Sequence, residues 1–313
     1  MATVYGFGSV AVDFRIVTAD FGKDYTQKLL AKETFSLPGG ATSNALTQVA
    51  RLGGKAVSLC KLGEDNVGDK IVDALTKENI DCSKIIRDKL VLSPFNVAVY
   101  AGENKRRVGG FLLPNALKEI TKEDVDFFTE NFKKGDYLLT EIGEIPLDII
   151  LYICKKAKEK GVKVVLDVDL DPITQCGSTK DLVDEIFKTV SILIPNRDSL
   201  VSIFPDMDEI EMAKKLKEIY NVLTVITMGS FGTCYAIPGH DEVYVQKAFK
   251  INAVDTIGAG DSFHGSLVYA LSLNKPIENA VIFASKCAAI NCTAFGATTA
   301  MPTLEILENF KFE

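Results

Sequence analysis

Residues 255–263 read DTIGAGDSF, and this glycine-rich stretch decides how the rest of the chain is interpreted. Apolar residues follow at a helical spacing, at Phe263, Leu267 and Leu271, so a helix is predicted to begin at about Asp261. Small residues before a helix start let backbone N–H groups approach an anion, and the helix dipole adds positive charge there. A carboxylate beside such an anion hole is suited to take a proton from an attacking hydroxyl. The alternative is a glycine-rich turn in which Asp261 only caps the helix.

Upstream of this stretch, short apolar strands alternate with helices. This alternation predicts an α/β fold with a mostly parallel central sheet and helices on both faces. The expected strands cover 3–10, 56–62, 136–141, 163–168, 191–195 and 222–227, followed by a hairpin at 232–247. The expected helices cover 41–52, 66–79, 121–132, 146–160, 179–189, 207–220, 260–273 and 276–294, with a last helix from about 303.

Two hairpin-like pieces, at 14–36 and 93–113, interrupt this alternation. Each carries β-rich runs around a turn signal, at 20–24 in the first piece and at 102–104 in the second. We expect the two pieces to pair as a small β-sheet lid at the sheet edge. No linker rich in Pro, Gly or Ser divides the chain, so residues 1–313 are interpreted as a single domain.

Composition excludes several classes of protein. The net charge of −7 argues against a nucleic-acid or membrane partner, because both need clustered Lys and Arg. The seven cysteines are scattered without a C-x-x-C pair, and the N-terminus lacks the pattern of a signal peptide, so we expect a cytoplasmic protein. Since His240 and His264 are the only histidines, a three-histidine zinc site is excluded.

The segment DTIGAGD at 255–261 resembles the C-terminal signature of the ribokinase-like (PfkB) carbohydrate kinase family. Three more segments resemble family motifs in the expected order: GSVAVD at 8–13, GGATSN at 39–44 and TMGSFG at 227–232. The resemblance extends over the whole chain. It implies a three-layer α/β/α ribokinase-like fold and an ATP-dependent kinase that transfers the γ-phosphoryl group to a hydroxyl of a sugar or sugar derivative.

The resemblance also implies a role for each matching residue. Asp261 is expected to be the general base, and Gly258, Ala259 and Gly260 to supply the amides of the anion hole. The substrate hydroxyls are expected to contact Asp13, Gly39, Gly40, Asn44 and Glu144. The nucleotide is expected to contact Asn196, Thr227, Gly229, Ser230 and Gly232. Family members use Mg²⁺ with ATP, and many are activated by K⁺, whose expected place is the main chain at Asp255 and Ile257.

Two segments depart from the family pattern. The metal-associated N-x-x-E is here NRDS at 196–199, so Ser199 replaces the glutamate. The common D-x-N-x-R is here DVDLD at 167–171, which adds carboxylates after a strand, at the edge where open α/β sheets bind ligands. We expect Asp167 or Asp169 to take over part of the contact with metal-bound water. The alternative is a solvated acidic loop.

Other functions remain open from the sequence. A nucleoside kinase of the same fold is one alternative, and a non-catalytic ligand-binding homologue is another, because of the lost glutamate at Ser199. A dinucleotide-binding fold is disfavoured, because G-x-G-x-x-A at 6–11 is followed by β-rich residues rather than by a helix. A neutral sugar is the default substrate, although the basic run at 105–107 is suited either to an acidic substrate group or to a solvated turn.

Apolar residues on both faces of the lid pieces predict an assembly. Ile16 and Val17 point to opposite faces of a strand, and so do neighbours in the run 111–113. One face of such a lid can cover an active site, and the other must meet water or another chain. We therefore expect a homodimer in which two lids pack together. The alternative is that the run 111–113 enters the main core.

Overall fold

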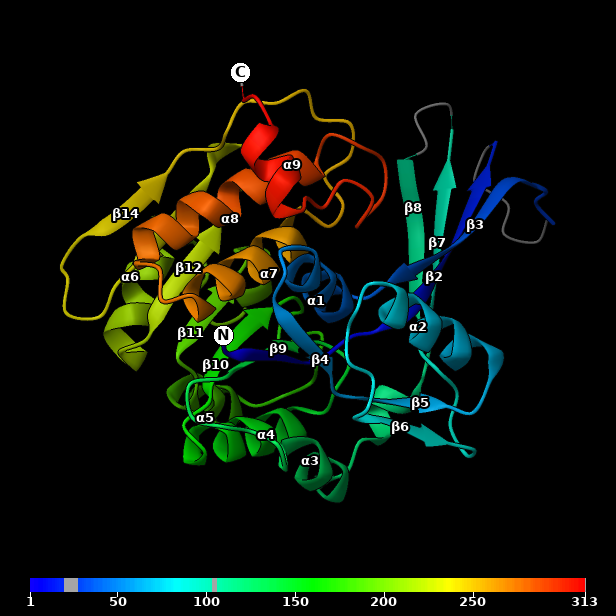
Figure 1. Ribbon diagram of the computed structural model, residues 1–313, viewed down its shortest axis with the longest axis horizontal. Helices are drawn as coiled ribbons and strands as arrows, with labels where there is room; N and C mark the ends of the chain where they lie inside the picture. Colours follow the sequence, from blue (N-terminus) through cyan, green and yellow to red (C-terminus); the bar gives the residue numbers. More distant parts are fainter. Residues whose placement is uncertain (20–27, 103–105, 313) are drawn as a thin grey trace.

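The computed structural model describes residues 1–19, 28–102 and 106–312. Its centre is an eight-stranded sheet in the order β14-β13-β12-β11-β10-β9-β1-β4 (Figure 1). Strands β12 to β4 in this order are parallel, and β13 and β14 extend one edge antiparallel. The bounds are β1 Thr3–Phe7, β4 Lys55–Ser58, β9 Tyr137–Ile142, β10 Lys163–Val168, β11 Ile192–Pro195, β12 Leu223–Thr227, β13 Thr233–Ala236 and β14 Val243–Gln246.

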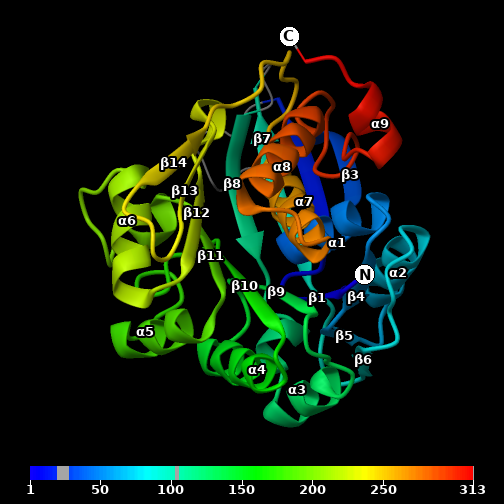
Figure 2. The same cartoon turned by 60° about the vertical axis from the view of Figure 1, so that its left-hand side comes forward.

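Helices cover both faces of this sheet (Figure 2). One layer contains α1 (Ala41–Arg51), α7 (Ala259–Ser272) and α8 (Ile277–Asn291), with α9 (Leu304–Asn309) packed outside it. The other layer contains α3 (Lys122–Thr129), α4 (Leu147–Glu159), α5 (Lys180–Thr189) and α6 (Glu209–Tyr220). The expected three-layer α/β/α fold with a mostly parallel sheet is confirmed. Within the ranges that the structure describes, no helix is long and apolar enough to cross a bilayer.

The central strands are apolar because helices cover them on both sides. Strand β9, for example, reads YLLTEI and is buried along its whole length. Its polar residues, Thr140 and Glu141, lie near its carboxyl end, and the Thr140 hydroxyl donates to the carbonyl oxygen of Phe7 at 2.6 Å. Polar groups therefore enter the sheet near the end of a strand, where open α/β folds place their ligands.

Two expected strands are divided differently in the structure. The strand expected at 3–10 ends at Phe7, and a new strand begins at Ala11, because Gly8 packs closely against Thr42 of α1 and the chain turns there. The strand expected at 56–62 is two strands. Its second part, β5 (Cys60–Gly63), leaves the central sheet and pairs with β6 (Ile85–Asp88), which the sequence did not predict. The apolar pattern shows which residues are buried, but it does not show a change of pairing partner.

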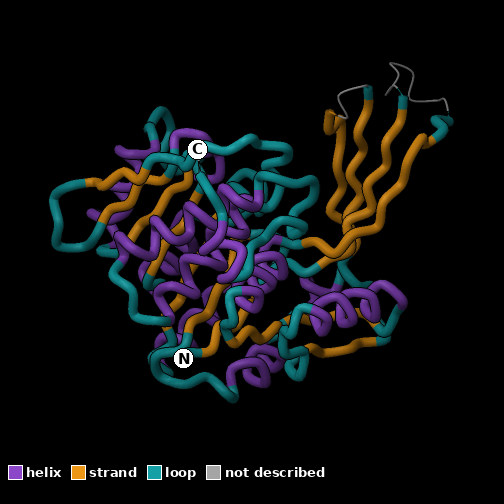
Figure 3. The backbone as a smooth tube through the Cα atoms, turned by 45° about the horizontal axis from the view of Figure 1, so that its top comes forward, coloured by secondary structure: helices purple, strands orange, loops and turns teal. Residues whose placement is uncertain are grey.

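A separate four-stranded sheet stands beside the body of the molecule, next to α2 (Asn66–Lys77) (Figure 3). Its order is β3 (Ala31–Gly39), β2 (Ala11–Thr18), β7 (Phe95–Ala101) and β8 (Arg106–Leu112), and we call it the lid sheet. The expected small sheet from 14–36 and 93–113 is confirmed, although 20–27 and 103–105 lie outside the described residues.

One alternative predicted that the run 111–113 enters the main core, and the structure contradicts it. Phe111 is 63% exposed, and Leu112 and Leu113 are exposed as well. Pairing registers place Phe14, Val97 and Phe111 side by side across three strands of the lid sheet. The lid sheet therefore has an apolar outer face that includes an exposed aromatic ring.

Candidate active site

The glycine loop before α7 has the geometry of an anion hole. Helix α7 begins at Ala259, and the preceding Gly258 has a φ of 80°, where a Cβ would also collide with the carbonyl oxygen of Ala297. Only glycine fits there without strain. The first amides of a helix have no partner within it. The Ala259 amide bonds back into the preceding turn at 3.2 Å, whereas no described hydrogen bond uses the amides of Gly258 or Gly260. Both of these amides are therefore left for an anion.

Asp261 lies in the first turn of α7, and its side chain is hydrogen-bonded to the glycine motif at 39–44. Asn44 Nδ2 donates to Asp261 Oδ2 at 2.7 Å. Asn44 lies in the first turn of α1, which packs along α7 and begins just after Gly40. The two motifs at 39–44 and 255–261 therefore meet at one pair of side chains.

The pKa of Asp261 is tuned toward neutrality. Its pKa is raised to about 6, mainly by burial. The carboxylates of Asp167 and Asp169 also raise this pKa, whereas the hydrogen bond from Asn44 and the charge of His264 lower it. A carboxylate with this pKa is mostly ionised at neutral pH and still accepts a proton readily.

Two further acidic groups come from the end of β10. Asp167 lies near the end of β10, where its Oδ2 is 3.2 Å from His264 Nδ1. Burial and the neighbouring Asp167 raise the pKa of Asp169 to about 6. Burial by itself would lower the pKa of His264, but Asp167 and then Asp261 raise it above its ordinary value. Asp167 and Asp169 are therefore brought to the site, and Asp167 is held there by an ion pair.

Glu141, at the end of β9, was not predicted as a site residue. Its Oε1 accepts the Ser9 amide at 2.6 Å, and its Oε2 accepts the Thr42 hydroxyl at 3.1 Å. Burial raises the pKa of Glu141 to about 8; a bond from Ser9 lowers it, while Asp167 and Asp169 raise it. Glu141 thus connects the start of α1 to the acidic strand ends.

Asp13 and the paired glycines, Gly39 and Gly40, form the side of the site that the lid sheet contributes. Asn96 Nδ2, on β7, donates to Asp13 Oδ1, on β2, at 3.1 Å. The other carboxylate oxygen of Asp13 packs so closely on Gly39 that a Cβ there would collide with it. Gly40 has a φ of 100°, and a Cβ on it would meet the main chain of Ser9. Glycine is therefore required at 39 and 40 for the carboxylate and the start of α1 to approach each other.

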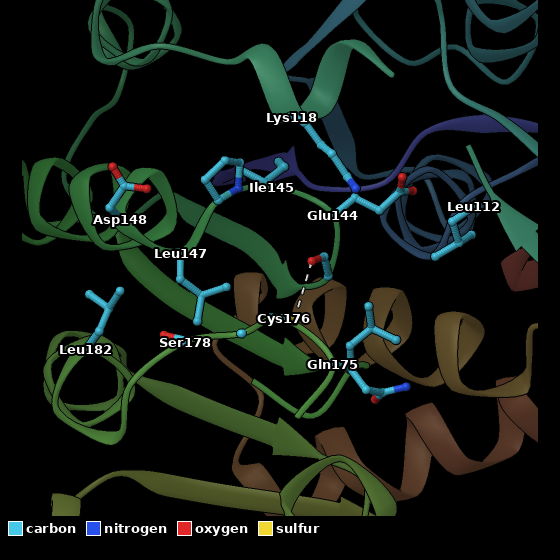
Figure 4. A pocket seen from close by; sticks show the side chains of 14 residues that line it. Leu112, Lys118, Glu144, Ile145, Leu147, Asp148, Gln175, Cys176, Ser178 and Leu182 are labelled. Atoms are coloured by element: carbon cyan, nitrogen blue, oxygen red, sulfur yellow. Dashed lines mark hydrogen bonds between the residues drawn. The ribbon is translucent and has the colours of Figure 1, made fainter. Parts of the chain in front are cut away.

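Glu144 lies farther along, in a groove of about 530 Å³ beside the end of the lid sheet (Figure 4). Its Oε2 accepts a hydrogen bond from Asn115 Nδ2 at 2.6 Å. Burial raises the pKa of Glu144, while the Asn115 bond and the charge of Lys118 lower it. The groove is also lined by Leu112 of the lid sheet, so Glu144 can contact only a ligand that extends toward this groove.

The expected nucleotide residues follow the next strands along the sheet. Asn196 comes directly after β11, and Thr227 is the last residue of β12. Gly229, Ser230 and Gly232 form the turn that leads into β13. They share the carboxyl edge of the parallel strands with the acidic residues of β9 and β10.

Ser199, which replaces the family glutamate, points inward. Its side chain is buried, its hydroxyl donates to the carbonyl oxygen of Asn196 at 2.8 Å, and its amide donates to Asn196 Oδ1 at 2.8 Å. Ser199 therefore fixes the turn that carries Asn196 and offers no carboxylate to a metal ion.

Asp255 and Ile257, the expected place for K⁺, tie the glycine loop to the chain after α8. Asp255 Oδ1 accepts the Ile257 amide and Oδ2 accepts the Gly296 amide, each at 3.0 Å. The carbonyl oxygen of Ile257 accepts a bond from Asn291 Nδ2 at 3.3 Å. Asp255 therefore supports the loop through its side chain.

Two of the residues that the sequence analysis missed, Glu141 and His264, could have been predicted from the sequence. Glu141 ends a predicted strand at the edge that binds ligands in this class of fold. His264 comes one helical turn after Asp261, which places both side chains on the same face of α7. Asn96 had no local signal, because its contact with Asp13 depends on the parallel pairing of β2 with β7.

A buried carboxylate beside amides at a helix start, on the carboxyl edge of a parallel sheet, has the geometry expected of a phosphotransferase site for a small molecule. The model of the pfkB family carbohydrate kinase matches residues 1–304, so the chain belongs to this family. The expected family is thereby confirmed, and with it the expectation of a carbohydrate kinase.

Similarity to single proteins extends over the whole chain. Ribokinase from Bacillus subtilis is 26% identical over 318 residues, which cover 98% of this chain and 99% of that protein. The structure of Arabidopsis thaliana ribokinase with ribose and ATP has a TM-score of 0.83 at 22% identity and covers 99% and 100% of the two chains. A double-mutant fructokinase from Vibrio cholerae with fructose, ADP and a potassium ion has a TM-score of 0.78 at 22% identity, covering 99% and 98%. Of the cofactors predicted from the sequence, ATP is present in the Arabidopsis thaliana complex and potassium in the Vibrio cholerae complex.

Proposed function

We propose that the chain is an ATP-dependent kinase that phosphorylates a hydroxyl of a sugar or sugar derivative, with Asp261 as general base. The observation that carries this proposal is the hydrogen bond from Asn44 to Asp261 beside the free amides of Gly258 and Gly260. It joins the side of the site that faces the sugar to the side that faces the phosphate. The ribose, fructose and nucleotide complexes of the similar proteins support the same reaction.

Each residue then has a defined task. Asp13, Asn44 and Glu144, with the amides at Gly39 and Gly40, bind hydroxyl groups of the sugar and orient one of them toward Asp261. Asp261 accepts the proton of that hydroxyl while the hydroxyl oxygen bonds to the γ-phosphorus of ATP. The bond from this phosphorus to the bridging oxygen breaks, and ADP leaves. The glycine loop then stabilises the charge on the transferring phosphoryl group. Such electrostatic stabilisation makes the largest contribution to catalysis in reactions of this kind. Asn196, Thr227, Gly229, Ser230 and Gly232 contact the nucleotide.

The acidic strand ends fit a divalent metal ion. Mg²⁺ prefers oxygen ligands and keeps several waters, so it needs carboxylates nearby rather than a closed protein cage. Across the described residues, no three acidic, histidine or cysteine side chains could hold a metal ion by themselves. Asp167 and Asp169 would contact its water ligands, and the bound ion would neutralise phosphate charge. The loop at Asp255 and Ile257 is the proposed place for K⁺.

The remaining expectations concern organisation. We interpret residues 1–313 as a single domain whose lid sheet covers the substrate. The apolar outer face of the lid sheet, with Phe111 exposed, supports a homodimer in which two lids pack together. All seven cysteines are unpaired, which supports a reducing, cytoplasmic location.

ADP release from ATP with a panel of sugars and nucleosides tests the proposed function. We expect release that depends on a sugar and on Mg²⁺. Activity with nucleosides alone would favour the nucleoside kinase. ATP binding without turnover of any compound would favour the non-catalytic homologue.

A further inference from the structure

Arg15 lies on the lid sheet, on the same face as the expected sugar-binding Asp13. The two residues are two positions apart in β2, so their side chains project from the same face of the sheet. This face is turned to the body, because the Arg15 guanidinium lies 6.0 Å from the ring of Phe295, in the chain after α8. The next residue, Gly296, is bonded to Asp255 of the glycine loop at 3.0 Å. Arg15 therefore lies between the sugar side of the site and the segment that supports the anion hole.

The guanidinium of Arg15 is buried and has no partner of opposite charge among the described residues. Arg15 is 5% exposed, and in the part of the chain that the structure describes its Nη1 atom has no hydrogen-bond partner. No carboxylate among the described residues forms an ion pair with it. Buried arginines are almost always paired, because a desolvated charge without a partner is strongly destabilising. The missing partner is then expected to come from a ligand.

On one side of Arg15 the lid sheet carries only small side chains. Across the lid sheet, Arg15 is opposite Ala98 on β7, and Ala98 is opposite Gly110 on β8. On the other side, Arg15 is opposite Phe35 on β3, so the sheet itself brings no charged group to the row of Arg15. In the next row, Asn96 has a buried Oδ1 without a partner among the described residues, while its Nδ2 bonds to Asp13. Asn96 can accept a bond from a sugar hydroxyl there, and Arg15 is suited to an adjacent anionic group.

We propose that Arg15 determines substrate specificity by pairing with a carboxylate or phosphate group on the sugar. The planar guanidinium matches both groups with two parallel N–H···O bonds. The preferred substrate is therefore a sugar acid or a sugar phosphate rather than a neutral sugar. This inference rests on the proposed function. A phosphate of the nucleotide would have the same chemistry, and the experiment must distinguish the two sources.

Matched pairs of compounds test the inference: ribose with ribonate, glucose with gluconate, and fructose with fructose 6-phosphate. The kcat/KM of each compound is measured for the wild type, Arg15→Gln and Arg15→Lys, together with the KM for ATP. Val17→Ala is the control, because Val17 is buried on the same face of β2 and carries no charge. Circular dichroism of each variant checks that the fold is intact.

We expect the wild type to favour the anionic member of at least one pair. Arg15→Gln should lower that preference by about 10- to 100-fold, as for a lost charged hydrogen bond, and Arg15→Lys should keep part of it. Val17→Ala should not change the preference. The inference is overturned if neutral members are favoured in every pair, or if Arg15→Gln leaves the ratio unchanged. It is also overturned if Arg15→Gln raises the KM for ATP while the ratio stays constant, since the anion is then the nucleotide. Absence of turnover with every compound in the wild type would instead contradict the proposed function.

Discussion

Replacing Asp261 with asparagine separates the catalytic role of the carboxylate from its place in the fold. The amide has nearly the same shape, and its oxygen can accept the bond that Asn44 donates to the carboxylate at 2.7 Å. Loss of a general base lowers turnover by roughly 10²–10⁴-fold. We expect Asp261→Asn to bind nucleotide with unchanged affinity and to lose kcat by this factor.

The same substitution should stabilise the ligand-free protein above neutral pH. The pKa of Asp261 rises from 3.8 in the unfolded chain to about 6 in the folded protein, so the folded form binds this proton more tightly. The stability from proton binding is fully present below about pH 4 and is lost as the pH rises through about 6, which amounts to up to about 3 kcal/mol. A neutral amide avoids this loss, and the pKa of about 6 already includes the effect of the bond from Asn44. We expect the free energy of unfolding to increase by about 3 kcal/mol at pH 8 and by little near pH 4.

Coupled ADP-release assays and urea denaturation at several pH values measure both effects. The kcat/KM of the wild type should rise as the pH passes through about 6 and then level off, and the residual activity of Asp261→Asn should lack this acidic limb. Asp241→Asn, an exposed carboxylate far along the β13–β14 hairpin, is the control and should change neither quantity. Turnover within about threefold of the wild type would refute the role of Asp261 as base. Lost activity together with lower stability at pH 8 would indicate misfolding instead of a lost base.

Three further variants test other parts of the molecule. Asp167→Asn combined with Asp169→Asn should raise the Mg²⁺ concentration for half-maximal rate several-fold, as measured by titrating Mg²⁺ at fixed ATP. An unchanged dependence on Mg²⁺ would show that the two residues only form a solvated acidic loop. Gly258→Ala should lower the free energy of unfolding by about 1–3 kcal/mol, because its φ is 80° and a Cβ collides with Ala297; equal urea midpoints for variant and wild type would contradict the described loop. Phe111→Asp should convert a dimer to a monomer in light scattering at low micromolar protein, since the ring is 63% exposed on the outer lid face; a wild type that is already monomeric and fully active excludes the lid-to-lid dimer.

Local features of the chain determined most of the fold and the centre of the site. The alternation of apolar strands and amphipathic helices predicts the three layers, because each pattern reports only on its own segment. The residues of the glycine motif at 255–261 share one loop and one helix start, so their geometry follows from their own φ angles and from the first turn of α7. Asp261 could therefore be proposed from its own segment, whereas Asn44 was implied only by the resemblance, and the hydrogen bond between them was not predicted.

Tertiary structure alone decided which residues are desolvated and which partners they have. The apolar run at 56–62 does not show that β5 leaves the central sheet, because pairing with β6 is a contact between distant segments. The raised pKa values of Glu141 and Asp261 arise from burial between layers, which no single segment encodes. Nothing in the sequence distinguishes Arg15 from other strand residues. Only when the lid sheet packs against the body does it become a buried cation that has no counter-charge within the described part of the chain. Periodicity and turn chemistry are local properties of the chain, whereas desolvation and charge pairing are sums over groups that folding brings together.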